Sequence, residues 1–516
     1  MDTKLRWKEH LEAVRQKAMN TVNALGCLGG STWGIGLLDL RKIYEGTALP
    51  QMMYASSIWY NANVRGGTYT QKTLDILRSI QARAARIICG AYRATSHAAL
   101  DVEAYLLPIE QQIWRHNADL ITRLLSSKAM TDMAGIQKGR LQPSRRTRPG
   151  LIDSWQKIYN DMKSRRSQGF SDQEPIPPFM TAPWREGPAA HIEANAENAR
   201  SRHDAQNDSG RSLSIYTDGS GIDGETGAAA VCPLIQETRA AHMGANTIST
   251  VYAAELQGIS LALQIAEQYA ERGGTRRDIA IYTDNQAAIW SIAKAEGRSG
   301  AYILEEIARQ VQQLQDKGRR VTVRWIPAHV GIPGNEAADI AAKESTGWRA
   351  DGRTQPPAEA PPTLFPLKST LRRWCKTQAE RTWADSWKAS AKGRATYRLT
   401  PRPTKKVLQL HEGLSKRESA LLVQMRTEKI GLNDFLFNRR VPEVISPRCE
   451  CGERRQTAAH ILLRCRIYKD LRNQVFGGLS GRHNLRAVLN KPQLATKAIE
   501  FIEQTQILGQ MGIRDA

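Results

Sequence analysis

Cysteine is scarce in this sequence, and long apolar runs and an acidic surplus are missing. The seven cysteines among 516 residues are odd in number and mostly scattered, so they make no disulfide framework. No stretch approaches the roughly 18 uninterrupted apolar residues of a membrane span. The first residues, MDTKLRWKEH, are charged and lack the apolar segment of a secretory signal. We therefore expect an intracellular protein of the nucleus or cytoplasm, neither secreted nor membrane-bound.

Positive charge is abundant instead, with a formal net charge of +22. A surplus of this size indicates a polyanionic partner, most commonly nucleic acid. A soluble protein with solvated lysine-rich faces is the alternative. The charge is unevenly distributed: residues 211–344 contain 13 Lys and Arg against 16 Asp and Glu, a net of −3, so the rest carries +25. The acidic centre and the basic flanks are therefore expected to have different tasks.

The length predicts about three domains, at the usual 100–200 residues each. Helical patterns dominate residues 1–130, and a basic, proline-bearing linker follows at 131–210. An ordered α/β segment occupies 211–348, and a second Pro-rich linker occupies 349–368. Residues 369–516 form a basic, mostly helical tail.

The α/β segment begins with SLSIYTDGS, which alternates apolar and polar residues and ends at a Gly-Ser turn. Two further strands are expected, at TGAAAVCPL and near His242. A helix follows over 251–271, and then the strands DIAIYTD and VTVRWIPAH alternate with further helices. This order predicts a mixed five-stranded sheet with flanking helices.

Four acids stand at the ends of these elements: Asp218 and Asp284 close strands, while Glu255 and Asp339 lie on helices. Each alone fits an ordinary role as a turn former, helix cap or surface acid. Together at one sheet edge they would repel one another, and a divalent cation relieves that repulsion. Hard oxygen ligands suit magnesium, and two such ions can hydrolyse a phosphodiester.

The acids lie in four motifs: YTDGS, AAEL, YTDN and AHVGIPGNEAAD. In sequence and order, these motifs resemble those of the type 1 ribonuclease H family, over about 135 residues. The resemblance implies a ribonuclease H-like fold that cleaves the RNA strand of RNA–DNA hybrids. It also implies two Mg²⁺ (or Mn²⁺) ions, held by Asp218, Glu255, Asp284 and Asp339.

His329 stands ten residues before Asp339 on a Gly/Pro-bearing loop. By the same resemblance it is the mobile histidine that helps move a proton or product from the site, work that suits an imidazole. Alone, it would be read as a structural loop residue. Ser220, Asn285 and Asn335 are candidates for contacts with the hybrid across its minor groove. The basic insertion that some family members carry is absent between Ala293 and Ser299.

The N-terminal region resembles the thumb side of a non-LTR retrotransposon reverse transcriptase. The resemblance rests on Asp2, Leu5, Trp7 and His10, and on the segment LPQMMYASSIWY over 49–60. An amphipathic core helix is the plainer interpretation of the same residues. The palm and fingers with their paired aspartates are missing, so we expect no polymerase activity.

The tail contains a Cys-x-Cys pair, a histidine and a last cysteine, at Cys449, Cys451, His460 and Cys465. Zinc takes four such soft ligands tetrahedrally. The group resembles the zinc-knuckle-like element found after ribonuclease H in these retroelements, although its Cys-x-Cys spacing is unusually narrow. Free thiols in a helical tail remain the alternative, and the nearby arginines favour phosphate contacts in either case.

These features predict the C-terminal part of a non-LTR retrotransposon polyprotein that cleaves RNA–DNA hybrids and also binds other nucleic acid. One rival is a catalytically silent nucleic-acid-binding relic of a retroelement. Another is a proofreading exonuclease, which places a second acid two residues after the first, where this chain has Ser220.

Overall fold

The chain is organised in two compact units. The structure is a computed structural model that describes residues 8–60, 68–127, 162, 173–177, 187–294, 299–353 and 355–509. Within these ranges, residues up to 117 and from 376 onward form one unit, here the helical unit, and those between 118 and 375 form the other, the sheet unit. Asp2, Leu5, Trp7 and most of the predicted linker up to residue 186 lie outside the described residues.

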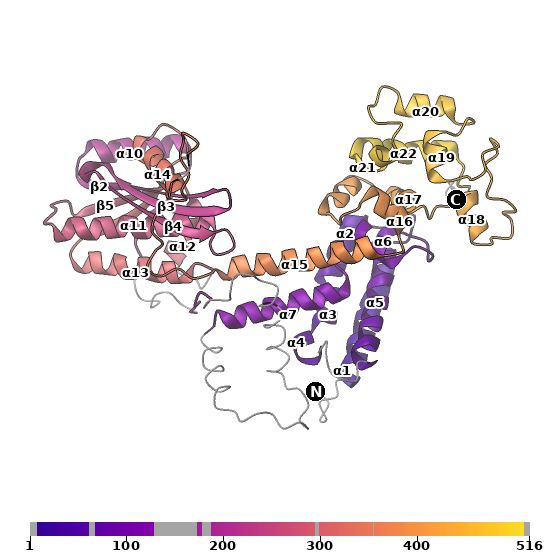
Figure 1. The fold of residues 1–516 in the computed structure, drawn as a ribbon, viewed down its shortest axis with the longest axis horizontal. Helices are drawn as coiled ribbons and strands as arrows, with labels where there is room; N and C mark the ends of the chain where they lie inside the picture. Colours follow the sequence, from indigo (N-terminus) through magenta and orange to yellow (C-terminus); the bar gives the residue numbers. More distant parts are fainter. Residues whose placement is uncertain are drawn as a thin grey trace. The chain divides into compact units, whose positions relative to one another are not determined.

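The sheet unit is built on a mixed six-stranded sheet in the order β1-β6-β5-β2-β3-β4 (Figure 1). Strands β2, β3 and β4 pair antiparallel, while β2, β5, β6 and β1 pair parallel. Their bounds are β1 Ala189–His191, β2 Ser212–Ile222, β3 Glu225–Cys232, β4 Glu237–Ala245, β5 Asp278–Thr283 and β6 Arg320–Trp325.

Helices cover both faces of this sheet, as Figure 1 shows. Alternation along the strands sends Leu213 and Ile215 into the larger core and Tyr216 into the smaller one on the opposite face. The larger core is closed by α11 (Val251–Glu271), α12 (Gln286–Lys294) and α13 (Ala301–Asp316). On the smaller core lies α14 (Pro333–Glu344), with α10 (Ala196–Asp208) contacting the same side through His203 and Tyr216.

The predicted mixed α/β class is confirmed, but the sheet has six strands where the sequence predicted five. The extra strand, β1, and helix α10 both lie in the segment that was expected to be a linker. A three-residue strand with every residue exposed carries no alternation, so its pairing with the β6 edge has no local signal.

The second Pro-rich segment, 349–368, is also more than a free linker. Its backbone is bonded to the sheet unit, where the His242 amide donates to Glu359 O at 3.1 Å and the Leu367 amide to Ile248 O at 2.9 Å. The Leu367 side chain is buried in the larger core. Short backbone pairings with proline-bearing chain leave no periodic pattern, so the composition alone indicated a linker.

The helical unit combines both ends of the chain around one hydrophobic core. Leu77 and Ile80 of the N-terminal region share that core with Leu422 and Phe501 of the tail. The thumb-like region and the basic tail, expected from the sequence as separate parts, therefore fold together. No helix within the described ranges is long and apolar enough to cross a membrane.

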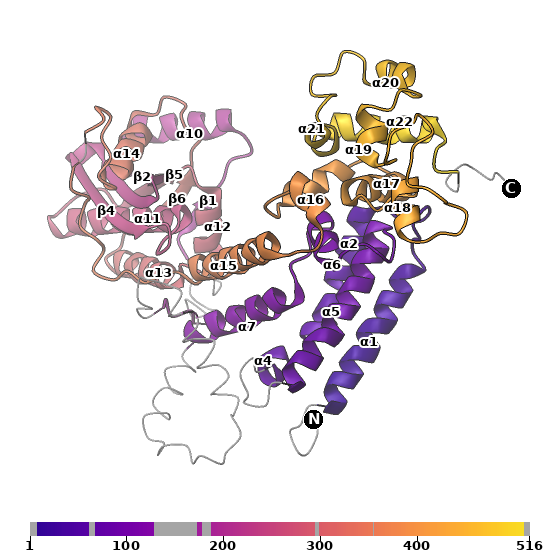
Figure 2. The same cartoon turned by 45° about the vertical axis from the view of Figure 1, so that its right-hand side comes forward.

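Most of this unit is helical, and α1 packs along α5 (Figure 2). Its N-terminal helices are α1 Lys8–Gly26, α2 Leu37–Gly46, α3 Ala48–Met53, α4 Ser56–Trp59, α5 Thr68–Cys89 and α6 His97–Glu103. Helices α7 (Ile109–Leu125) and α15 (Lys368–Ala389) contribute residues to both units. The tail adds α16 Arg394–Leu399, η2 Lys405–His411, α17 Lys416–Thr427, α18 Asn433–Asn438, α19 Ala458–Leu463, α20 Lys469–Phe476, α21 Leu485–Asn490 and α22 Pro492–Thr505.

A fully buried ion pair links the two ends inside this core. Arg426 of α17 donates from Nε to Glu103 Oε2 of α6 at 2.7 Å, and both side chains are 0% exposed. Its remaining nitrogens donate to Thr400 Oγ1, Asn490 Oδ1 and Leu489 O. Every guanidinium nitrogen is used, whereas Glu103 Oε1 has no hydrogen-bond partner among the described residues. The pair specifies how α6 meets α17.

Glu103→Gln should therefore destabilise the helical unit. The substitution keeps the shape but leaves Arg426 charged and unpaired, which costs about 3 kcal/mol or more. Denaturant unfolding followed by helical circular dichroism measures the loss. The matched control is Glu500→Gln, which breaks an exposed pair with Lys497 at 2.6 Å and should cost less than about 1 kcal/mol. Equal losses in the two variants would show that the buried pair contributes no more to the free energy of unfolding than the exposed pair does.

Candidate active site

Two carboxylates lie at adjacent strand positions in the middle of the sheet. Thr217 of β2 pairs with Thr283 of β5, and Asp218 and Asp284 are the next residues on each chain. The backbone at Asp284 is fixed because Trp325 Nε1 donates to its carbonyl oxygen at 3.1 Å. Parallel pairing of β2 with β5 therefore brings both acids to the same edge.

A third carboxylate, Glu255, reaches this edge from α11 because two glycines let the helix pack closely against the sheet. A Cβ built on Gly219, beside Asp218, would lie 2.5 Å from the Glu255 amide nitrogen. One on Gly258 would lie 3.0 Å from Ala229 O of β3. Both contacts are shorter than ordinary packing of a side-chain carbon, so a larger residue at either position would push α11 off the sheet.

The three carboxylates form a compact group: one oxygen each of Asp218, Glu255 and Asp284 lies within 4.8 Å of the others. Asp218 and Glu255 are only 7% and 4% exposed. Burial, reinforced by the neighbouring acids, raises the pKa of Asp218 to about 7 and that of Glu255 to about 9. Burial also raises the pKa of Asp284. Ionisation of all three carboxylates is therefore unfavourable without a nearby cation. Hard oxygen donors in this arrangement fit a divalent cation such as magnesium.

Polar contacts missed by the sequence analysis hold Glu255 in place. Thr283 Oγ1 donates to Glu255 Oε2 at 3.5 Å, and a hydrogen bond from the Asn285 side chain lowers the pKa of Glu255 against the larger effect of burial. Asn285 also caps α12, since its Oδ1 accepts from the Ala288 amide at 3.1 Å. Asn285, expected to contact substrate, therefore has a structural task as well.

The fourth predicted acid, Asp339, lies near the group but outside the three that meet within 4.8 Å. Its charge raises the pKa of both Asp218 and Asp284, after the larger effect of burial on each. Lys343, one helical turn later, donates from Nζ to Asp339 Oδ2 at 2.6 Å. The i,i+4 spacing of these two residues on α14 was the available signal for this ion pair.

His329 lies exposed on the loop between β6 and α14, with a left-handed backbone φ of 54°. The His329 imidazole lowers the pKa of Asp284 against the larger effect of burial, so the two side chains interact electrostatically. The other two substrate candidates are largely buried: Ser220 is 8% and Asn335 4% exposed. Within the described ranges, Asn335 Oδ1 has no hydrogen-bond partner.

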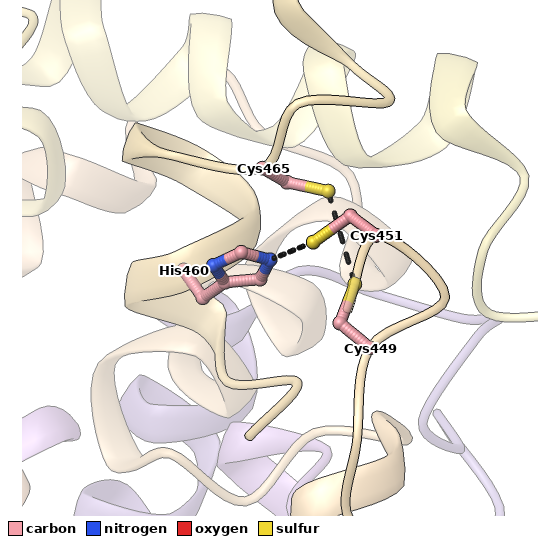
Figure 3. A group of neighbouring side chains, drawn as sticks. All are labelled: Cys449, Cys451, His460 and Cys465. Carbon is pink, nitrogen blue, oxygen red and sulfur yellow. Dashed lines mark hydrogen bonds between the residues drawn. The ribbon is translucent and has the colours of Figure 1, made fainter. Parts of the chain in front are cut away.

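The tail brings its own group of four ligand atoms together, as Figure 3 shows. Cys449 Sγ lies 3.8 Å from Cys465 Sγ, and Cys451 Sγ lies 3.2 Å from His460 Nε2. All four atoms are within 4.8 Å of one another. Tetrahedral zinc, with bonds to sulfur of about 2.3 Å, sets neighbouring sulfurs about 3.8 Å apart. The donor set and its spacing therefore fit one zinc ion.

Comparison with known proteins relates part of the chain to a protein family. Residues 210–346 match the model of the RNase H family. A Pol polyprotein from type-1 retrotransposable element R1 4 of Nasonia vitripennis is 32% identical over 108 residues, which cover 21% of this chain and 26% of that protein. The Pol polyprotein of element R1 2 from the same species is 29% identical over 138 residues, 26% of this chain and 32% of that protein.

The chain thus spans between a quarter and a third of the length of these curated relatives. Among solved structures, RNase H1 of the archaeon Halobacterium salinarum matches with 20% identity and a TM-score of 0.20, over 26% of this chain and 96% of that one. The family match encloses all four predicted acids and the strands β2 to β6. Residues 210–346 are therefore a ribonuclease H domain.

Proposed function

We propose that this domain hydrolyses the RNA strand of RNA–DNA hybrids endonucleolytically, within a retrotransposon-derived protein. The observation that carries the proposal is the convergence of Asp218, Glu255 and Asp284 within 4.8 Å, inside the segment that matches the ribonuclease H family. The R1-element relatives support the retroelement origin.

The carboxylates are proposed to hold two Mg²⁺ or Mn²⁺ ions, with Asp339 as the fourth ligand. When bound, such a pair of ions activates a water molecule and stabilises the leaving oxygen of the phosphodiester. Asp339 Oδ2 accepts from Lys343 Nζ at 2.6 Å, so Lys343 also places a cation beside an anionic substrate. His329, exposed beside Asp284, is proposed to carry a proton or product away from the site.

The silent relic is the alternative function. A basic surface can bind nucleic acid without a group of closely spaced carboxylates, which lowers stability. Here the glycine approach at Gly219, the Thr283 contact and the carboxylate group are all present together. We therefore favour an active enzyme. DNA synthesis is not part of the proposal.

The group of four ligand atoms from Cys449, Cys451, His460 and Cys465 is proposed to hold one structural Zn²⁺ in the helical unit. Cys449 and Cys465 are both buried in the core that joins the two chain ends, and Leu462 of α19 packs in that core as well. A metal at this point therefore stabilises the fold of the tail rather than catalysing a reaction.

Asp284→Asn should abolish hybrid cleavage in the presence of Mg²⁺. The change removes one negative ligand and keeps the side-chain shape, and metal-based stabilisation is worth several kcal/mol, so the rate should fall by about 10³-fold or more. The matched control is Asp278→Asn at the other end of β5, where the carboxylate pairs with exposed Arg320. A labelled hybrid resolved on a denaturing gel gives the readout. Equal cleavage by wild type and Asp284→Asn would refute the site.

Elemental analysis of the full chain should return one zinc per molecule, and Cys465→Ser should lower that value and the unfolding temperature together. The full chain is required because the cysteines share a core with the N-terminal helices. Cys27→Ser, at an exposed cysteine, is the matched control and should leave both measurements unchanged. Metal-free protein that unfolds at the same temperature with or without added Zn²⁺ would identify the group as free thiols.

A further inference from the structure

A pocket of about 650 Å³ opens on the helical unit, far in sequence from the ribonuclease H domain. Three segments line it: 94–99 at the start of α6, 390–398 at α16, and 427–429 after α17. All three belong to the same compact unit, so the pocket is a property of that unit alone. We call it the basic pocket.

Cations dominate the wall of the basic pocket. Lys392, Arg394, Arg398 and Lys429 line it, while Glu428 is the one carboxylate among its lining residues. Glu428 is already engaged, because Arg398 donates to it from a terminal nitrogen at 2.9 Å. The pocket therefore presents a net positive charge to any ligand.

Arg394 is held in a fixed orientation without an acid. Its guanidinium carbon lies 3.8 Å from the centre of the Tyr397 ring, and one terminal nitrogen donates to the carbonyls of Lys388 and Ser390. No described carboxylate pairs with Arg394 or with the Lys392 ammonium group. Cations that lack an acidic partner, such as the oriented Arg394, are suited to an external anion.

Further cations crowd the same region. Arg86 lies beside the pocket, with a terminal nitrogen 3.4 Å from His97 Nε2. Partial burial, with added repulsion from Arg86 and Lys392, lowers the pKa of His97. Arg86 itself is repelled by Arg93 and Arg83. An arriving anion would relieve this mutual repulsion, which favours binding beyond the direct contacts.

The hydrogen-bonding groups of the wall indicate phosphate as the anion. Thr95 and Ser96 supply hydroxyls among the lining residues, whereas the Ser390 hydroxyl already donates to Lys392 O at 3.2 Å. Hydroxyls together with Arg and Lys are common partners of backbone phosphates in nucleic-acid complexes. Basic residues also continue beyond the pocket: between 386 and 411 the chain has seven Lys and Arg and no Asp or Glu. Of these, Lys388, Arg402, Lys405 and Lys406 are exposed outside the pocket. An extended run of this kind matches a chain of phosphates better than a single one.

We propose that the basic pocket binds successive backbone phosphates of a nucleic-acid strand. This is a binding site outside the ribonuclease H domain and independent of its proposed cleavage. It would bind without regard to base sequence, since phosphate contacts carry no sequence information.

The test is a salt titration of binding to a short labelled DNA duplex, measured by fluorescence anisotropy with the full chain. DNA duplex is not a substrate of the proposed nuclease, so the result is independent of whether the domain cleaves hybrid. For Lys392→Gln/Arg394→Gln, we expect severalfold weaker binding at low salt. The slope of log affinity against log salt should fall by about 0.9 for each phosphate that the variant no longer neutralises. Lys392→Gln alone should give half of this change without disturbing the Arg394–Tyr397 contact.

The matched control is Lys469→Gln/Arg486→Gln, which removes two exposed cations of the same unit that do not line the pocket. Its affinity and slope should stay near wild type. Equal effects of the pocket and control variants would overturn the proposal, since only total charge would then matter. A competition arm separates ligand sources: inorganic phosphate or a mononucleotide that displaces the duplex at equal phosphate concentration would assign the pocket to free phosphate and overturn the strand assignment.

Discussion

The crowding of three carboxylates, two of them buried and one half-buried, is the constraint on which the sheet unit is organised. Asp218, Glu255 and Asp284 are brought together by the β2–β5 register and by the close approach of α11 at Gly219. Raised pKa values show that the fold holds these acids against their preference for charge. Such an arrangement lowers the free energy of unfolding unless a bound cation offsets the effect. Its presence is therefore explained by a function rather than by stability. Asp339, compensated by Lys343 in its present position, adds negative potential without entering the group.

The ribonuclease H domain and the rest of the chain differ in charge. The ribonuclease H domain is close to neutral or slightly acidic, whereas the remainder of the chain carries the +25 surplus. A metal site built from acids attracts phosphate weakly before its ions arrive, while oriented cations such as Arg394 attract phosphate directly. Holding nucleic acid and cutting it are thus assigned to different residues. Packing of the fold positions both sets of residues. The carboxylates lie at one edge of the sheet, and the cations of the basic pocket lie where three helix-bearing segments meet.

The sequence was sufficient for the features that rest on local pattern. Alternation in SLSIYTDGS and DIAIYTD located the central strands, and Asp218 and Asp284 proved to be neighbours in the sheet. The expected end of the first strand at Asp218 was wrong, because β2 continues through the Gly-Ser pair to Ile222 and pairs there with β3. Features that rest on distant contacts were missed. The strand β1 is too short for alternation, and the joint core of the two chain ends depends on pairs such as Glu103 and Arg426, 323 residues apart. The burial of these two charged side chains cannot be read from the local sequence, because Glu and Arg are exposed in most proteins.

The most direct measurement of the central claim is the unfolding temperature of the full chain with and without Mg²⁺. Without Mg²⁺, Asp218→Asn should unfold a few degrees above wild type, because a carboxyl group whose ionisation is opposed by burial and by the neighbouring acids is replaced by a neutral amide. With Mg²⁺ at about 100 times its Kd, wild type should gain stability of about 2.7 kcal/mol, and the variant much less. Asp278→Asn should behave as wild type. Equal gains from Mg²⁺ in wild type and Asp218→Asn, or a variant less stable than wild type without metal, would contradict the account.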